Sequence, residues 1–261
     1  MKILVFLKKT PDTESKIQIS SNNTAIETND VKFIINPYDE YAIEEAIQIK
    51  EKNPGTEVVI ASFGDESVRE LIIKGLAMGG DRGLLISNEG LANLDSLAIA
   101  KVLAAAVKAE KADLVLVGKQ AIDDDNMHVG PMLGEILDWA HVNVVSKLVL
   151  DGTNATAERE AEGGHVEVYK FALPAVIGAN KGLNNPRYAA LPGIMKAKKK
   201  PFDVKKLADL VIDAAQLQAK VIVKAYQYPP QKPAGQIFKG EAVDAMVAKV
   251  VKLLREEAKV L

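Results

Sequence analysis

The sequence predicts an α/β protein with an open, mostly parallel sheet, helices on its faces, and a C-terminal linker and helix arm. Two observations favour the sheet: short apolar runs alternate with longer amphipathic segments up to about residue 139, and strands joined by helical crossovers lie parallel. A third observation predicts the arm, because a proline-rich stretch separates the last apolar stripe from the rest of the chain.

The predicted parallel strands are short runs rich in Val, Ile and Leu, as expected for strands buried on both faces. They cover residues 3–7, 57–63, 83–87 and 112–117. The segments between them, residues 39–52, 66–78 and 94–108, carry apolar side chains close to the 3.6-residue period of an amphipathic helix. A polar stretch over residues 11–30 breaks this alternation and indicates a hairpin inserted after the first strand.

The pattern changes after Trp139, where we expect strands over residues 142–150, 166–171 and 175–179 and a helix over 204–212. Beyond these, Pro229 and Pro230 indicate an extended linker, because proline fixes φ and has no N–H to donate. An apolar stripe on a final helix follows. We therefore expect an α/β domain over residues 1–225 and a linker with a partner-packing helix over 226–261.

Composition excludes several classes of function. A net charge of -2 argues against a nucleic-acid or anionic-membrane binder. The absence of cysteine excludes disulfides, thiolate nucleophiles and Cys-held iron–sulfur clusters, and three dispersed histidines disfavour a zinc site. The N-terminal apolar run is too short for a signal peptide, and no run is long enough to span a bilayer. We expect a cytoplasmic protein without direct membrane insertion, or an imported and processed one in a cell with organelles.

Residues 113–132 carry the strongest signal for chemistry, because a buried strand leads into a polar loop and then into a helix. The first N–H groups of such a helix are unpaired and attract anions such as phosphate. Asp123, Asp124 and Asp125 lie in this loop. Metal ligation and capping of the following helix are both open, and the divergent directions of adjacent side chains favour capping.

Two motifs make the chain resemble the β, or small, subunit of electron transfer flavoprotein. The first is the stretch GKQAIDDD from Gly118, followed by Leu137, Asp138 and Trp139; the second is LNNPRYAALPGIMKAKKK from Leu183. The likeness extends over nearly the whole chain. It implies a fold of the adenine-nucleotide-binding type.

The resemblance implies a heterodimer with an α subunit and no catalytic residue in this chain. The dimer would accept electrons from dehydrogenases such as acyl-CoA dehydrogenases and pass them to a quinone reductase or another acceptor. FAD would be held mainly by the α subunit, and this chain would bury AMP as a structural ligand. The implied nucleotide site consists of Phe6, Asn36, Pro37, Tyr38, Asp39, Phe63, Gly64, Gly118, Lys119, Gln120, Ala121, Ile122, Asp123, Asp124, Asp125, Asn126, Met127, His128 and Val129.

One stretch departs from the AMP-binding pattern of the family. Val129, Gly130 and Pro131 stand where AMP-binding members tend to have Thr-Gly-Gln, and they resemble electron-bifurcating members that hold a second FAD. Those members, however, tend to have glycine where this chain has Asp124. A carboxylate there repels a second phosphate, so AMP is favoured over a second FAD.

The resemblance also implies partner-binding residues. The block from Ala190 to Met195 resembles a loop that docks on dehydrogenases, with Leu191 as its anchor, beside Pro192, Ile194 and Met195. The alternative is that Leu191 and Ile194 pack inward. The lysines at 196 and 198–200 read as a solvated run, and Glu160 stands where the family has a glutamate that contacts the flavin domain of the α subunit.

Two functions of other classes remain as alternatives. A free-standing nucleotide-binding regulator would share this architecture, since fold does not fix function. A hydrolase or ligase acting on an adenylate is disfavoured because the sequence shows no recognisable nucleophile or phosphate-binding glycine-rich loop.

Overall fold

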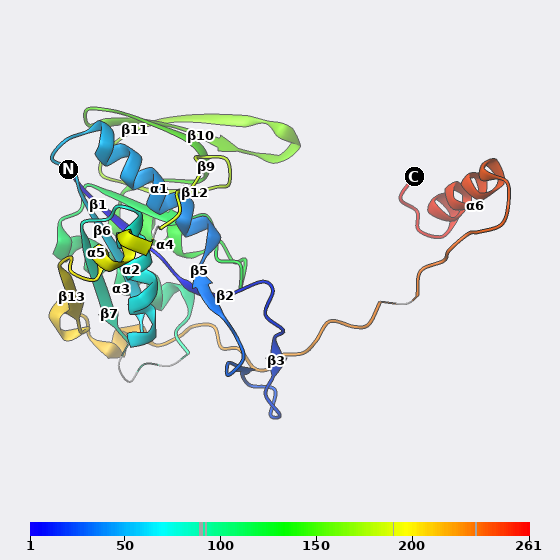
Figure 1. Ribbon diagram of the computed structural model, residues 1–261, viewed down its shortest axis with the longest axis horizontal. Coiled ribbons are helices and arrows are strands. Elements are labelled where there is room, and N and C mark those ends of the chain that lie inside the picture. The colour runs from blue at the N-terminus through cyan, green and yellow to red at the C-terminus, as the bar shows by residue number, and fades with distance from the viewer. Residues whose placement is uncertain (89–90, 92, 190, 233) are drawn as a thin grey trace. The chain divides into compact units, whose positions relative to one another are not determined.

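The computed structural model describes residues 1–88, 91, 93–189, 191–232 and 234–261 (Figure 1). The chain divides into two units, Met1–Ala225 and Tyr226–Leu261. The first unit contains the sheet and the helices packed against it.

Within the described residues the main sheet has nine strands in the order β11-β10-β9-β12-β8-β1-β6-β7-β13. These strands are β1 (Lys2–Phe6), β6 (Glu57–Gly64), β7 (Arg82–Ser87), β8 (Leu114–Gly118), β9 (Ala140–Asp151), β10 (Asn154–Glu160), β11 (Val166–Ala172), β12 (Ala175–Ala179) and β13 (Phe202–Lys205). Pairing is parallel from β9 to β13 across the sheet, and antiparallel for β9-β10 and β10-β11. The predicted open, mostly parallel sheet is confirmed.

The order of the strands reverses at β1. From β1 the chain continues to β6 and β7 on one side of the sheet, whereas β8 and β12 pair on its other side. Register is continuous across this centre, with Leu4 opposite both Val59 and Val115. In an open α/β sheet, the crevice for a ligand lies outside the carboxyl ends of the strands at such a reversal.

Helices cover both faces of the sheet. The helices α1 (Pro37–Lys52), α2 (Arg69–Met78) and α5 (Leu191–Ala197) pack on one face, and α3 (Ser96–Glu110) and α4 (Val129–Leu137) pack on the other. Short 3-10 turns lie at Glu66–Val68, Glu162–Gly164, Ala208–Leu210 and Ala214–Leu217. Each face buries a separate apolar cluster; Ile3 and Val5 point into one, and Leu4 and Phe6 into the other, as strand alternation requires.

Two small ribbons follow β1. β2 (Lys9–Pro11) pairs with β5 (Phe33–Ile35), and between them β3 (Gln18–Ile19) pairs with β4 (Ile26–Glu27). The hairpin predicted within residues 11–30 is therefore confirmed.

The helix predicted over residues 204–212 is wrong. Phe202–Lys205 forms the edge strand β13, which pairs in parallel with β7, and Ala208–Leu210 forms a 3-10 turn. Phe202–Lys205 contacts β7, and Ala208–Leu210 contacts α3. These tertiary contacts override the helical spacing of the apolar residues in the segment.

A network of ion pairs joins charged residues at the amino ends of β1 and β7 to Glu110 at the end of α3. Glu110, whose side chain is 6% exposed, pairs with Arg82, with Lys205 at 3.2 Å and with Lys2 at 3.5 Å. Arg82 also bonds Asp203 at 2.7 Å. Burial favours the neutral form of Glu110, but these cations outweigh burial and lower the pKa of its carboxyl.

The second unit contains helix α6 (Val243–Glu256), which buries none of its residues. Val243 is 69% exposed and Val247 is 53% exposed, on the apolar stripe that the sequence predicts. In the part of the chain that the structure describes, no helix is long and apolar enough to cross a membrane.

Candidate functional site

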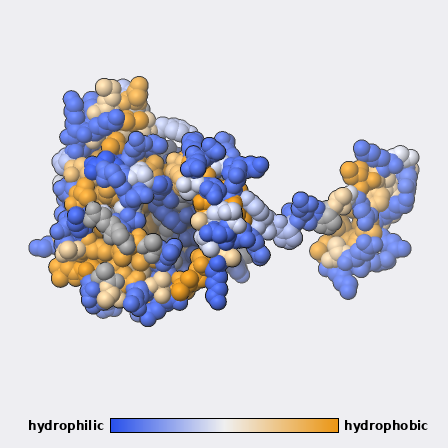
Figure 2. Space-filling model, turned by 90° about the horizontal axis from the view of Figure 1, so that it is seen from below, coloured by the Kyte–Doolittle hydropathy of each residue, from blue (hydrophilic) through white to orange (hydrophobic). Residues whose placement is uncertain are grey.

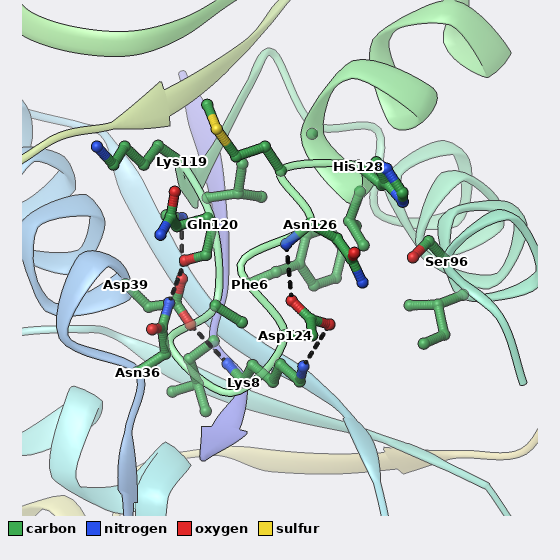
Figure 3. A pocket seen from close by; sticks show the side chains of 18 of the residues that line it. Phe6, Lys8, Asn36, Asp39, Ser96, Lys119, Gln120, Asp124, Asn126 and His128 are labelled. Carbon is green, nitrogen blue, oxygen red and sulfur yellow. Dashed lines mark hydrogen bonds and ion pairs between the residues drawn. The ribbon is translucent and has the colours of Figure 1, made fainter. Parts of the chain in front are cut away.

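A pocket opens at the carboxyl ends of β1, β6 and β8, where the strand order reverses (Figure 3). It is bordered by the 119–128 loop and by the first turns of α3 and α4. Its lining consists of Phe6, Leu7, Lys8, Asn36, Asp39, Phe63, Ser96, Ile99, Leu103, Val117, Gly118, Lys119, Gln120, Ala121, Asp124, Asn126, Met127, His128, Val129 and Gly130.

Asp39, near the start of α1, forms the floor of this pocket. One carboxylate oxygen accepts the backbone N–H of Lys8 at 2.7 Å, and the other accepts that of Gly118 at 2.9 Å. Asp39 thereby ties together the ends of β1 and β8. Burial raises the pKa of its carboxyl to about 7, although these hydrogen bonds oppose the shift. A side chain at position 118 would overlap Asp39 and Tyr38, so the close approach requires glycine.

Asn36 fixes the loop over the pocket. Its amide nitrogen donates to the carbonyl of Gln120 at 2.8 Å, and its amide oxygen accepts the N–H of Ile122 at 3.2 Å. The side chain is almost fully buried. The loop is therefore held by a residue more than 80 positions away in the sequence.

The three consecutive aspartates do not cap α4, and the capping interpretation is wrong. Lys8 Nζ lies 2.8 Å from Asp123 and 3.1 Å from Asp124, and Asp125 accepts from Gln120. Burial opposes the charge on Lys8, but the two carboxylates outweigh it and raise the pKa of the amine. Lys8, which follows β1, competes for these acids, and a local capping argument does not consider so distant a partner. Among the described residues no group of three or more His, Cys, Asp or Glu is placed to hold a metal ion.

The first turn of α4 keeps unpaired N–H donors toward the pocket. No side chain caps this helix, and Pro131 in its first turn has no N–H. The N–H of Asn126 is taken by Asp124 at 3.2 Å. Asp125 and Met127 adopt left-handed conformations, with φ of 50° and 56°, a local strain that tends to occur at ligand sites. The N–H groups of Val129 and Gly130 remain as donors for an anion.

The first turn of α3 faces the same pocket. Asp95 caps this helix by accepting the N–H of Ala98 at 2.9 Å. The next residue, Ser96, lines the pocket, and Figure 3 shows its hydroxyl directed toward Asn126 and His128. The first turns of α3 and α4 therefore border one cavity, and the uncapped positive end of α4 favours a negatively charged ligand there.

Most residues of the predicted nucleotide site meet in this pocket, but six do not line it: Pro37, Tyr38, Gly64, Ile122, Asp123 and Asp125. Sequence reasoning missed Leu7, Lys8, Ser96, Ile99, Leu103 and Val117, and it named Gly130 only for its departure from the family pattern. A signal for Lys8 and Ser96 exists in principle, since Lys8 follows the first strand and Ser96 begins a predicted helix, and such positions lie at the carboxyl edge of a parallel sheet.

The predicted docking loop is a short helix, α5, from Leu191 onward. Leu191 is 73% exposed and Met195 is 66% exposed, and Pro192 is exposed, so the inward-packing alternative fails for Leu191. Ile194 is half-buried. Ala190 lies outside the described residues. Tyr188, which the sequence did not single out, is 99% exposed beside this helix.

Arg187 holds the segment before α5 against α1. Its guanidinium bonds the buried carboxylate of Glu44 at 2.8 and 3.0 Å, and that of Glu51 at 2.7 and 3.1 Å. Asn184 adds hydrogen bonds to Glu45 and to the carbonyl of Tyr41, both at 3.0 Å. Asn184 and Arg187, in the motif Asn-Asn-Pro-Arg, thus fasten the base of the exposed segment to α1.

Two further predicted features differ in outcome. Lys196, Lys198 and Lys199 are exposed as predicted, but the amine of Lys200 donates to the carbonyls of Leu76 and Gly80 at the end of α2. Burial lowers the pKa of this amine. Glu160, at the end of β10, is exposed and accepts the side-chain N–H of the buried Asn180 at 2.8 Å.

Comparison with known proteins shows the family of this chain. Residues 23–210 match the electron transfer flavoprotein domain. The chain belongs to the electron transfer flavoprotein β-subunit family. It is 44% identical to the electron transfer flavoprotein subunit beta of Bacillus subtilis over the full length of both chains. It is 41% identical to that of Homo sapiens over 98% of both, and 40% identical to that of Bradyrhizobium diazoefficiens over the full length of both.

Membership of the electron transfer flavoprotein family makes electron transport with a flavin the general role of this chain. The pocket of this chain combines apolar walls with helix N-termini.

Proposed function

We propose that this chain is the β subunit of a heterodimeric electron transfer flavoprotein and holds one AMP as a structural ligand. The observation that carries this proposal is the pocket at the strand reversal, where the first turns of α3 and α4 meet apolar walls. FAD, when bound mainly by the α subunit, supplies the electron-transfer chemistry. The residues of this chain orient and enclose ligands.

The pocket matches the two halves of an adenylate. The side chains of Phe6, Phe63, Ile99, Leu103 and Val117 provide apolar surface for a purine. The N–H groups of Val129 and Gly130 provide donors for a phosphate. Apolar walls with a few fixed polar groups are typical of small-ligand sites.

A second FAD in place of AMP, as in electron-bifurcating members, is the second candidate. Val129, Gly130 and Pro131 favour it, because they resemble the two-flavin members. Asp124 opposes it. Its carboxylate is fixed in the pocket lining by Lys8 and by the N–H of Asn126, where it excludes a second phosphate by charge and by volume.

The exposed segment around Leu191 supports docking on partner dehydrogenases, such as acyl-CoA dehydrogenases, which would deliver electrons to the flavin. A single apolar side chain can dominate a small, transient interface. A quinone reductase or another acceptor would then receive the electrons. Glu160, held by Asn180, would face the flavin domain of the α subunit. We place the complex in the cytoplasm.

The unburied stripe of α6 supports a heterodimer over a free-standing regulator. Apolar area gains about 25 cal/mol per Å² when it leaves water. Val243, Val247 and Leu254 lie on this helix, which buries no residue in its own unit. We expect this face to pack on the α subunit.

Co-expression with the α subunit tests the proposal. We expect a yellow heterodimer that takes electrons from a reduced dehydrogenase, whereas this chain alone is colourless. Deletion of residues 234–261 should abolish the heterodimer. An undiminished heterodimer after the deletion would disprove the role of the arm, and a chain that never associates with the α subunit would favour the regulator.

A further inference from the structure

The docking segment, residues 188–199, carries apolar side chains that the domain does not bury. Tyr188, Leu191 and Met195 are all exposed. A segment with few buried apolar contacts changes conformation easily unless other contacts hold it. Its conformation therefore depends on the residues that hold its two ends.

Arg187 holds the first end. Its guanidinium donates two hydrogen bonds to Glu44, whose side chain is buried, and two to Glu51. Its backbone N–H also donates to Glu44 at 3.2 Å. Both acids lie on α1. A planar guanidinium that bonds two carboxylates has a fixed orientation, so it sets the course of the chain just before Tyr188.

Lys200 holds the second end. Its amine donates to the carbonyl of Leu76 at 3.0 Å and to that of Gly80 at 2.5 Å, at the carboxyl end of α2. A cation complements the negative end of a helix. Between the two ends, Ala197 is buried in the core, and α5 packs beside α2 (Figure 1).

The end of α2 does not depend on Lys200 alone. The amine of Lys50, on α1, donates to the carbonyl of Gly79 at 3.2 Å and pairs with Asp81. Two lysines therefore contact the same end of α2, and only one of them belongs to the chain that leaves the docking segment. Lys200 adds a link between α2 and that segment.

We propose that Arg187 and Lys200 are positioning residues that hold the docking segment in the conformation that an electron-donating dehydrogenase recognises. This role rests on the docking function proposed above. A segment held at both ends keeps Leu191 in place before the partner arrives, so less conformational entropy is lost on binding. When either contact is lost, the segment adopts other conformations, and the apparent affinity falls with the fraction that stays competent.

The test uses the complete heterodimer as the varied electron acceptor of an acyl-CoA dehydrogenase. Arg187→Lys keeps the charge and loses the planar group, and Lys200→Met keeps the length and loses the amine. Each should raise KM about fivefold, as for a segment that is competent in about one fifth of the molecules. The kcat and the flavin content should be unchanged. Glu51→Gln, a milder change at an exposed partner of Arg187, should raise KM about threefold.

A double-mutant cycle with Leu191 separates positioning from a general loss of stability. If Arg187 and Lys200 act by placing Leu191, each of their substitutions should change KM less than twofold in a Leu191→Ala background.

Lys50→Met is the matched control, because it removes an amine from the same end of α2 without touching the docking segment. We expect this variant to unfold at a lower urea concentration than the unmodified protein. Its KM should stay within twofold of the unmodified value.

Two results would overturn the positioning role: a KM within twofold of the unmodified value for Arg187→Lys or Lys200→Met, or fivefold increases that persist in the Leu191→Ala background. An unchanged KM for Leu191→Ala alone would instead overturn the docking function. The two failures are distinguishable, because the first leaves the effect of Leu191→Ala intact.

Discussion

The two ends of the sheet differ in how their polar groups are paired. At the amino end, Glu110 lies within bonding distance of three cations, and Arg82 within that of three acids. At the carboxyl end, the first turn of α4 is uncapped, and Met127 is held in a left-handed conformation. At the amino end, charged side chains form ion pairs with one another. At the carboxyl end, backbone N–H groups in the first turn of α4 have no side-chain partner.

The exposed apolar residues around α5 form a third region for this comparison. Figure 2 shows hydrophobic patches interspersed with hydrophilic ones on one face of the molecule. The exposed large apolar residues include Tyr188, Leu191 and Met195 around α5. We therefore distinguish a structural end of the sheet, a ligand end, and a docking segment, and the predictions below separate them.

Glu110→Ala should have the largest effect on stability. The substitution removes a carboxylate that neutralises several cations in a mostly buried network, which costs about 3 kcal/mol of unfolding free energy. Urea unfolding of the heterodimer measures this loss, with Glu66→Ala as an exposed control. Nucleotide content per folded heterodimer should stay unchanged, and a loss of nucleotide at full stability would break the distinction between the two ends.

A substitution of Asp39 tests a buried acid at the ligand end. Its raised pKa, about 7 against 3.8 without burial, means that the folded state keeps a proton that the unfolded state releases. The stability contributed by Asp39 is therefore full below about pH 4 and is lost as the pH rises through about 7. We expect the unfolding free energy of the unmodified protein, minus that of Asp39→Asn, to fall over this range at about 1.4 kcal/mol for each pH unit.

Asp151→Asn, at an exposed position, is the control for the Asp39 measurement. A difference for Asp39→Asn that does not change with pH would contradict the raised pKa of the Asp39 carboxyl.

Leu191→Ala tests the docking segment and has the smallest expected effect. Loss of an exposed apolar anchor should raise the KM for a partner dehydrogenase about tenfold, or about 1.4 kcal/mol, in a dehydrogenase-coupled assay. Heterodimer stability and flavin content should be unchanged. Early unfolding with loss of flavin would instead mean that Leu191 stabilises the fold.

The sequence predicts the parallel core well, because strands such as 3–7 and 112–117 are buried on both faces and read as continuous apolar runs. It fails at the sheet edge. Phe202–Lys205 is a four-residue strand that pairs with β7, which lies more than 100 positions earlier in the sequence. No local spacing encodes that pairing.

In the site, too, the local sequence does not predict which distant residues are in contact. The motif from Gly118 to Val129 predicts where the pocket lies, since a strand, loop and helix follow one another along the chain. The partner of Asp123 and Asp124 is Lys8, which is 115 and 116 positions away. Ser96 approaches from another helix. Such pairings depend on how crossovers bring strand ends together, so the structure is needed to find them.

The central claim is that the ligand end of the sheet holds one nucleoside monophosphate. Denaturing the purified heterodimer and counting the released nucleotides by chromatography tests this claim most directly. We predict one FAD and one AMP for each heterodimer. Two FAD and no AMP would contradict the account, show that Asp124 does not exclude a second phosphate, and assign the protein to the electron-bifurcating type.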